Sequence, residues 1–289
     1  ERLLITLILV CTMNNITNAQ NPFYGQYHTP HEAVPFDRIE TEHYEPAILE
    51  GIKLQNAEIE AIIQNPEKAD FSNTIEAFEA SGELLDKVVA VFGNMLSAET
   101  NDDLQELAQK IMPLLSEHSN NITLNKKLFA RVKEVYNQKE TLQLTEEQKQ
   151  LLENAYNSFI RHGANLEGEA REEYRRLTTE LSKLTLTFSE NNLKETNAYQ
   201  MLLTKKESLA GLPEIIIEAA AETAKNEEKE GWAFTLHAPS YIPFMTYSDN
   251  RDLRQKLYMA YNTKCTHDNE FNNIDIVKKI ANTRMKIAQ

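Results

Sequence analysis

Two histidines and a glutamate lie close together early in the chain and could together bind a metal ion. His28, His31 and Glu32 occur in the segment HTPHE. Imidazole nitrogens and a carboxylate oxygen are ligands that Zn²⁺ accepts. However, Pro30 lies between the two histidines and works against the helix that would bring them to one face. We therefore interpret HTPHE as a surface segment rather than a metal site.

The helix motif H-E-x-x-H, which places two histidines on one face around Zn²⁺, does not occur in the sequence. The remaining histidines are isolated from one another: His43, His118, His162, His237 and His267. Of these, His237 adjoins an expected strand, and we interpret it as a core or loop histidine. We therefore assign no catalytic, cofactor-binding or metal-binding residue to this chain, and we expect the chain alone to bind no zinc.

Carboxylates are abundant in the sequence, but their number alone does not indicate a catalytic site. Glu45, Glu50, Glu58 and Glu60 lie on an expected helix among other polar residues. General acid–base catalysis needs a pair of carboxyl groups in one desolvated pocket. The sequence indicates no such pair, so we expect these glutamates to be solvated.

Residues 240–264 are rich in tyrosine and also contain two arginines one helical turn apart. The residues concerned are Tyr241, Tyr247, Tyr258, Tyr261, Arg251 and Arg254. Such side chains could line a channel for peptides. They could equally pack between helices, and this second interpretation is the one we favour.

The elements that must position these residues are predicted to be helical. Only 8 Gly and 9 Pro occur in 289 residues, and 26% of the residues are charged, a composition typical of helical proteins. The net charge of −14 repels phosphate backbones and anionic lipid surfaces, so we expect no nucleic-acid partner.

Residues 1–19 have the pattern of a secretory signal peptide. Arg2 precedes an apolar run that ends at Val10, and a small-x-small pattern ends at Ala19. We expect export to the periplasm or cell envelope. Lipid attachment at Cys11 and an ordinary buried strand or helix remain alternatives. Removal of the signal would leave Cys265 as the one cysteine, interpreted as a structural or partly exposed thiol.

Prolines divide the first half of the chain. Residues 21–39 contain three prolines and are predicted to be extended, and a helix is predicted over 40–64. Asn73 with Glu76 resembles a cap for the next helix. That helix would carry one apolar stripe: Ile75, Phe78, Leu85, Val88, Phe92 and Met95.

Capping residues predict the next helices. Asn101 or Thr100 opens one, and Thr145 with Gln148 forms a capping box for another, which Gly163 ends. A longer helix is predicted over 168–196. Its apolar seam suits a long antiparallel helix pair: Tyr174, Leu177, Leu181, Leu184 and Phe188.

The last third is predicted to contain the only β structure. Residues 198–204 and 232–237 alternate as strands do, and Leu212-Pro213 opens a helix between them. Three further helical stretches follow at 239–247, 249–262 and 270–289. The last keeps its apolar spacing to Gln289 without a capping residue, so we expect no natural domain boundary there. The predicted fold is thus predominantly all-α, with a small β element near 198–237.

Several segments, in this order and spacing, resemble the dipeptidyl carboxypeptidase branch of the thimet-oligopeptidase family of zinc metallopeptidases. The resemblance covers essentially all of 21–289. It is carried by NPF at 21–23, FDRIETEHYEPAILEGIKLQNAEIEAI at 36–62, DFSNTIEAFEASGELLDKVVAVF at 70–92, TNDDLQ at 100–105, LNKKLFARV at 124–132 and RDLRQKLYMAYNTK at 251–264.

The resemblance implies a two-lobed helical peptidase with a deep channel, in which zinc bound by H-E-x-x-H and a further glutamate activates water. On this interpretation residues 20–289 are the helical N-terminal region, truncated before the zinc-binding catalytic region. The full-length protein, a monomer, would bind zinc and release C-terminal dipeptides from short peptides, whereas this chain alone would be inactive. The alternatives are a non-catalytic helical peptide-binding module and an unrelated helical scaffold.

Overall fold

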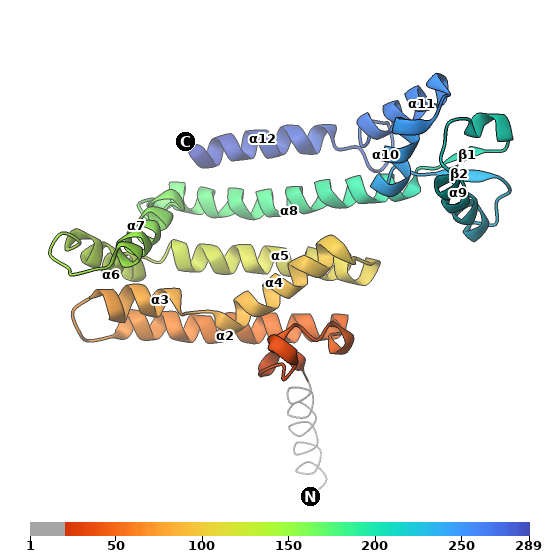
Figure 1. Cartoon of the computed structure of the whole chain (residues 1–289). Coiled ribbons are helices and arrows are strands. Elements are labelled where there is room, and N and C mark those ends of the chain that lie inside the picture. The colour runs from red at the N-terminus through yellow and green to blue at the C-terminus, as the bar shows by residue number, and fades with distance from the viewer. Residues whose placement is uncertain (1–20) are drawn as a thin grey trace, which may run out of the picture. The chain divides into compact units, whose positions relative to one another are not determined.

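The computed structural model describes residues 21–289. The predicted signal peptide and Cys11 lie outside the described residues. The chain divides into two compact units, one ending at Thr179 and the other running from Glu180 to Gln289. Figure 1 shows that most of the described chain is helical, so the predicted fold class is confirmed.

The first unit begins with a segment without a long helix, residues 21–40, which we call the opening segment. It contains three short helical turns, Pro22–Tyr24, Pro30–Glu32 and Phe36–Arg38. Prolines at or just before these turns fix the backbone and prevent continuation. The predicted absence of a long helix in 21–39 is therefore confirmed, but the segment folds into short helical turns rather than being extended throughout.

Helix α2 (Thr41–Gln64) packs closely against α4 (Glu83–Ala98). The contact depends on Gly51, because a Cβ atom there would lie 2.9 Å from the Cα of Leu85. That distance is shorter than two carbon atoms tolerate, so a glycine is required for the helices to approach this closely. The predicted helix over 40–64 is confirmed.

The single helix predicted from Asn73 to Met95 is wrong in two respects. The N-cap is Asp70, whose carboxylate accepts a hydrogen bond from the backbone nitrogen of Asn73 at 2.7 Å, while Asn73 caps back to the nitrogen of Asp70. The helical turns Phe71–Glu76 and α3 (Ala77–Glu79) then end before Gly82. Gly82 has φ +86°, a conformation that stops a right-handed helix, and α4 starts after it.

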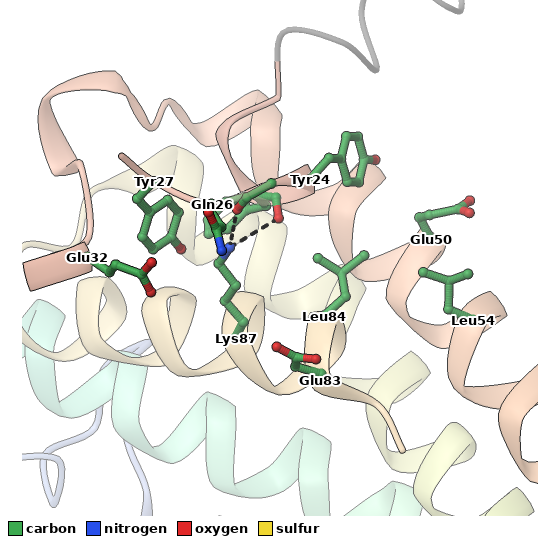
Figure 2. A pocket seen from close by; sticks show the side chains of 11 residues that line it. Tyr24, Gln26, Tyr27, Glu32, Glu50, Leu54, Glu83, Leu84 and Lys87 are labelled. Atoms are coloured by element: carbon green, nitrogen blue, oxygen red, sulfur yellow. Dashed lines mark hydrogen bonds between the residues drawn. The ribbon is translucent and has the colours of Figure 1, made fainter. Parts of the chain in front are cut away.

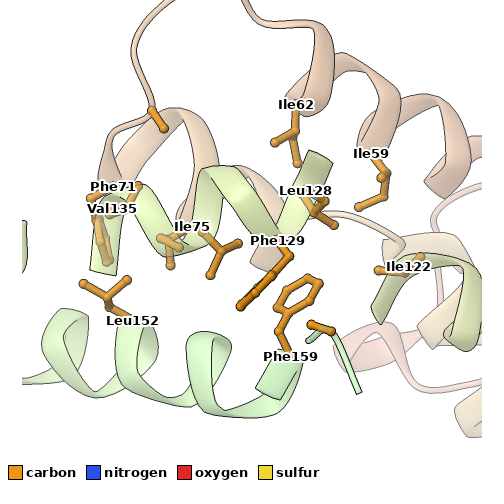
Figure 3. Close-up of a cluster of buried hydrophobic side chains, with 13 residues drawn as sticks. Ile59, Ile62, Phe71, Ile75, Ile122, Leu128, Phe129, Val135, Leu152 and Phe159 are labelled. Carbon is orange, nitrogen blue, oxygen red and sulfur yellow. The ribbon is translucent and has the colours of Figure 1, made fainter. Parts of the chain in front are cut away.

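Helices α5 (Asp102–Thr123), α6 (Lys126–Asn137) and α7 (Glu146–Arg161) complete the first unit together with the start of α8. The predicted caps at Asn101 and Thr145 are both present. Figure 3 shows the core that α2, α6 and α7 share with the turn at Phe71–Glu76. At its centre, the Phe159 ring stacks on Phe129 at 5.8 Å and meets Phe78 at 5.5 Å.

Helix α8 (Gly168–Ala198) runs from the first unit into the second. Its predicted seam is correct only in its first half. Tyr174 and Leu177 are buried, whereas Leu181 and Leu184 are half-buried and Phe188 is 39% exposed. A heptad spacing shows which residues share a face but not how far a partner helix follows that face.

The second unit contains the two strands. Strands β1 (Met201–Leu203) and β2 (Trp232–Phe234) pair antiparallel, with Met201 opposite Phe234 and Leu203 opposite Trp232. This confirms the predicted β element. Helices α9 (Glu214–Asn226), α10 (Ala238–Tyr247) and α11 (Arg251–Asn262) surround a core in which the Phe234 and Phe244 rings meet edge to face at 4.6 Å. Helix α12 (Ile274–Ala288) follows.

Candidate functional site

A pocket of about 680 Å³ lies between the opening segment and helices α2 and α4 (Figure 2). The opening segment supplies most of its lining, including Tyr24, Tyr27 and Glu32, because its first helical turn packs against both helices. Glu50 and Leu54 come from α2, and Glu83, Leu84 and Lys87 come from α4. The pocket therefore combines apolar, acidic and basic side chains.

Lys87 of α4 forms hydrogen bonds with the backbone of the opening segment. Its Nζ atom donates hydrogen bonds to the carbonyl oxygens of Gly25 at 2.7 Å and Phe23 at 3.4 Å. The same ammonium lies 4.0 Å from the centroid of the Tyr27 ring, a cation–π contact. Burial lowers the pKa of Lys87, while the nearby carboxylates of Glu83 and Glu32 raise it.

Tyr27 is 8% exposed, and its hydroxyl has no hydrogen-bond partner among the described residues. Burial raises the pKa of Tyr27, so the phenol is neutral at physiological pH and retains both a donor and an acceptor function. Figure 2 shows the hydroxyl directed toward the space between the side chains of Glu32 and Lys87. A buried hydroxyl without a partner is uncommon and calls for an explanation.

The three carboxylates of the pocket differ in their partners. Glu50 forms an ion pair with Lys53 at 2.9 Å. By contrast, neither Glu32 nor Glu83 forms a hydrogen bond or an ion pair with another residue of the described part of the chain. The pocket therefore carries more negative than positive charge.

The structure places His28, His31 and Glu32 on the surface, as expected for a surface segment. All three have positive φ, between 53° and 57°, so no regular helix aligns the two imidazoles. Within residues 21–289 there is no group of three or more His, Cys, Asp or Glu side chains arranged to hold a metal ion. His237 is an exposed loop histidine at the start of α10, within 3.0 Å of the amide oxygen of Asn197.

The glutamates of α2 have structural contacts that the sequence did not reveal. Glu45 pairs with Lys110 of α5 at 2.5 Å, and Glu58 accepts a hydrogen bond from the backbone nitrogen of Gly82 at 2.8 Å. Glu60 accepts one from Gln64 on its own helix. Glu58 and Glu60 are exposed, as expected, although both also accept hydrogen bonds, whereas Glu45 is half-buried and ion-paired, so the interpretation as a solvated residue is wrong for Glu45.

The tyrosine-rich segment of the second unit is partly packed and partly exposed. The rings of Tyr241 and Tyr261 stack at 4.2 Å, and Arg254 donates to the carbonyl oxygen of Ser248. Tyr247 and Tyr258 are each about half exposed. Packing between helices thus explains Tyr241 and Arg254, whereas Tyr247, Tyr258 and Arg251 remain on the surface.

Cys265 is a buried thiol, 5% exposed. Burial and the neighbouring Glu195 carboxylate raise its pKa to about 11. A nucleophilic cysteine needs a lowered pKa, so this environment is that of a structural thiol, as expected from the sequence.

None of the helices within 21–289 has both the length and the apolar character needed to cross a membrane.

Sequence reasoning missed the pocket entirely. Lys87 and Tyr27 are 60 positions apart, and neither belongs to a motif. The only signal near the pocket is the cluster of aromatic residues in NPFYGQY at 21–27, which does not identify the helix that it covers.

Comparison with known proteins shows that the chain is similar to bacterial peptidases. It is 35% identical over 269 residues to the dipeptidyl carboxypeptidase of Escherichia coli K12 and 34% identical to that of Salmonella typhimurium. It is 28% identical to oligopeptidase A of Salmonella typhimurium. These alignments cover 91–93% of this chain but only 39–40% of each relative. No family model matches the chain.

The alignments therefore match nearly the whole chain to about two fifths of each peptidase. The agreement with two differently named peptidases excludes the interpretation as an unrelated helical scaffold. Over nearly all of its length, this chain is therefore similar to about two fifths of the dipeptidyl carboxypeptidases and oligopeptidases A.

Proposed function

We propose that this chain is the helical N-terminal region of an exported zinc peptidyl-dipeptidase and forms one wall of its substrate channel. The observation that carries the proposal is the 35% identity over 93% of the chain to a dipeptidyl carboxypeptidase. Identity to the oligopeptidases A is lower, at 28–30%, which favours release of dipeptides from the C-termini of short peptides.

Zinc, which the family resemblance implies, does not fit the residues present. No three potential ligands converge within 21–289, and a catalytic zinc site needs three protein ligands and one open position. We therefore derive no catalytic step from this chain. Its proposed contribution is to shape and line the channel, while the residues that bind zinc belong to another part of the full-length protein.

Exposed apolar side chains on the second unit support the proposal that another part of the full-length protein packs against it. Large apolar side chains on α10, α11 and α12 are 39–58% exposed: Ile242, Tyr247, Tyr258, Met259, Tyr261, Ile274, Val277 and Met285. Surfaces rich in such side chains usually contact something other than water. We propose that the remainder of the peptidase covers them and that the full-length protein is a monomer.

Export is proposed from residues 1–19 alone. Expression of the coding sequence in a Gram-negative bacterium, followed by fractionation and mass spectrometry, tests it. We expect a periplasmic or cell-envelope product that begins near Gln20. A cytoplasmic product that retains residues 1–19 would contradict export, and a lipid on Cys11 would identify the anchored alternative.

The functional test is hydrolysis of a blocked tripeptide by the purified chain with added zinc. We expect no turnover, because no metal site is present among residues 21–289. Turnover that a chelator abolishes would contradict this. The alternative function, a non-catalytic peptide-binding module, predicts instead that the isolated chain binds short peptides and that its reading frame encodes no zinc site.

A further inference from the structure

We propose that the pocket between the opening segment and helices α2 and α4 binds a small organic cation, namely an ammonium group carried on an apolar arm. The proposal concerns residues 23–87 and does not depend on the proposed peptidase function.

The charge of the pocket favours a cation. The lining contains three carboxylates, Glu32, Glu50 and Glu83, but only one ammonium, that of Lys87; Glu50 is paired with Lys53 outside the lining. That ammonium is already engaged by two carbonyl oxygens and the face of the Tyr27 ring. Glu32 and Glu83 attract Lys87 only through longer-range electrostatics, and neither carboxylate forms a hydrogen bond or an ion pair within the described part of the chain. A second cation can pair with them.

The Tyr27 hydroxyl supplies an independent indication of a ligand. It is buried and without a partner, yet Figure 2 shows it directed into the space beside Glu32 and Lys87. An ammonium group can donate one N–H to the phenolic oxygen and another to a carboxylate, because each acceptor has a free lone pair. Binding would thereby satisfy a hydroxyl that the free protein leaves unpaired.

The rest of the lining suits an apolar arm. Leu54 lines the pocket and is 42% exposed, so its apolar surface is available to a ligand. Leu84 and Tyr24 line the same pocket. The volume of about 680 Å³ lies in the range of small-molecule sites. The matching ligand therefore has a positive end near Glu32 and Glu83 and an apolar end near Leu54.

Two sources can provide this chemistry, a free amine and the amino terminus of a peptide. Phenethylamine represents the first, with 3-phenylpropionate as a control of similar size and opposite charge. A Phe-Gly-Gly tripeptide represents the second, with its N-acetyl derivative as control. Isothermal titration calorimetry of residues 20–289 against each compound measures the dissociation constants.

We expect phenethylamine to bind and 3-phenylpropionate not to bind at the same concentration. Glu32→Gln and Glu83→Gln should each weaken binding about fivefold, the effect of losing one partly exposed ion pair. Tyr27→Phe should weaken it by a similar factor, since one hydrogen bond is lost. Glu60→Gln is the matched control on α2 outside the pocket and should change nothing.

The peptide arm identifies the source. Binding of Phe-Gly-Gly but not of its N-acetyl derivative, more tightly than phenethylamine, would indicate a peptide amino terminus. Tighter binding of phenethylamine would indicate a free amine. Three outcomes would overturn the proposal. The first is equal binding of phenethylamine and 3-phenylpropionate, and the second is unchanged binding by the two Glu→Gln variants. The third is no binding of any cation at a concentration on the order of 10 millimolar, which corresponds to the weakest specific affinities. A circular-dichroism melt of each variant verifies that it is folded.

Discussion

The buried histidine of α5 should make the first unit less stable in weak acid. His118 is 6% exposed, and its Nε2 lies 2.6 Å from the amide oxygen of Gln55. The Gln55 amide nitrogen donates to the carbonyl oxygen of Ser81 at 3.3 Å, which fixes the orientation of the amide. Nε2 therefore carries the proton, and Nδ1 is left as an acceptor without a partner in the described structure.

Protonation of Nδ1 would place a positive charge among apolar neighbours. Phe78, Leu115 and Ile122 line the pocket of about 310 Å³ beside the ring, and Asp86 is the carboxylate that shares this lining. Burial lowers the pKa of His118 below its ordinary value of 6.5. The unfolded chain thus binds a proton at a higher pH than the folded chain does, so stability is present above pH 6.5 and is lost as the pH falls below it.

The size of the effect follows from linkage. A group that stays neutral in the folded state contributes a slope of up to about 1.4 kcal/mol per pH unit. Between pH 7.5 and 5.5 the largest loss from one such histidine is therefore also about 1.4 kcal/mol. Urea unfolding of residues 20–289, followed by circular dichroism at both pH values, measures it.

His118→Gln removes the titrating group, so the variant should lose less stability than the parent between pH 7.5 and 5.5. Leu152→Ala is the matched control, because it destabilises the core of the same unit without removing a titrating group. It should retain the pH dependence of the parent. An identical loss for the parent and His118→Gln would refute the reasoning.

Three further predictions concern stability and reactivity. Tyr27→Phe removes a hydroxyl without a partner and should leave the free energy of unfolding unchanged or raise it by up to about 1 kcal/mol, which urea titration checks; a clear loss would show that the hydroxyl is structurally paired. Phe159→Ala should cost about 3–5 kcal/mol in the same assay, whereas Phe188→Ala, at an exposed position, should cost less than about 0.5 kcal/mol. With a pKa of about 11, Cys265 is about 0.1% thiolate at pH 8 and should react slowly with iodoacetamide, and Glu195→Gln should accelerate the reaction; fast labelling of the folded parent would contradict this.

Local signals in the sequence predicted most of the helices correctly. The capping box at Thr145 and the cap at Asn101 are contacts within three residues, so the sequence contains both partners side by side. The strands near 201 and 232 were also predicted from alternating residues, an alternation that appears as alternating burial in β1 but not in β2.

The errors have a common physical origin in contacts between distant residues. In the sequence, the apolar stripe continues across Ala80–Gly82 and predicts one unbroken helix. In the structure the helix breaks at Gly82, and α4, which starts after the break, packs closely against α2 at Gly51. The seam of α8 likewise continues past the point where its side chains are buried. Glu58 and Lys87 each bond to backbone atoms that lie 24 and 62–64 positions away, which no local pattern indicates.

The most direct test of the proposed function is to read the coding DNA beyond the codon for Gln289. If this chain is the N-terminal region of a zinc peptidyl-dipeptidase, the reading frame continues and encodes H-E-x-x-H on a helical pattern, with a further glutamate downstream. A stop codon directly after Gln289 would contradict the proposal and leave the non-catalytic peptide-binding module as the better interpretation.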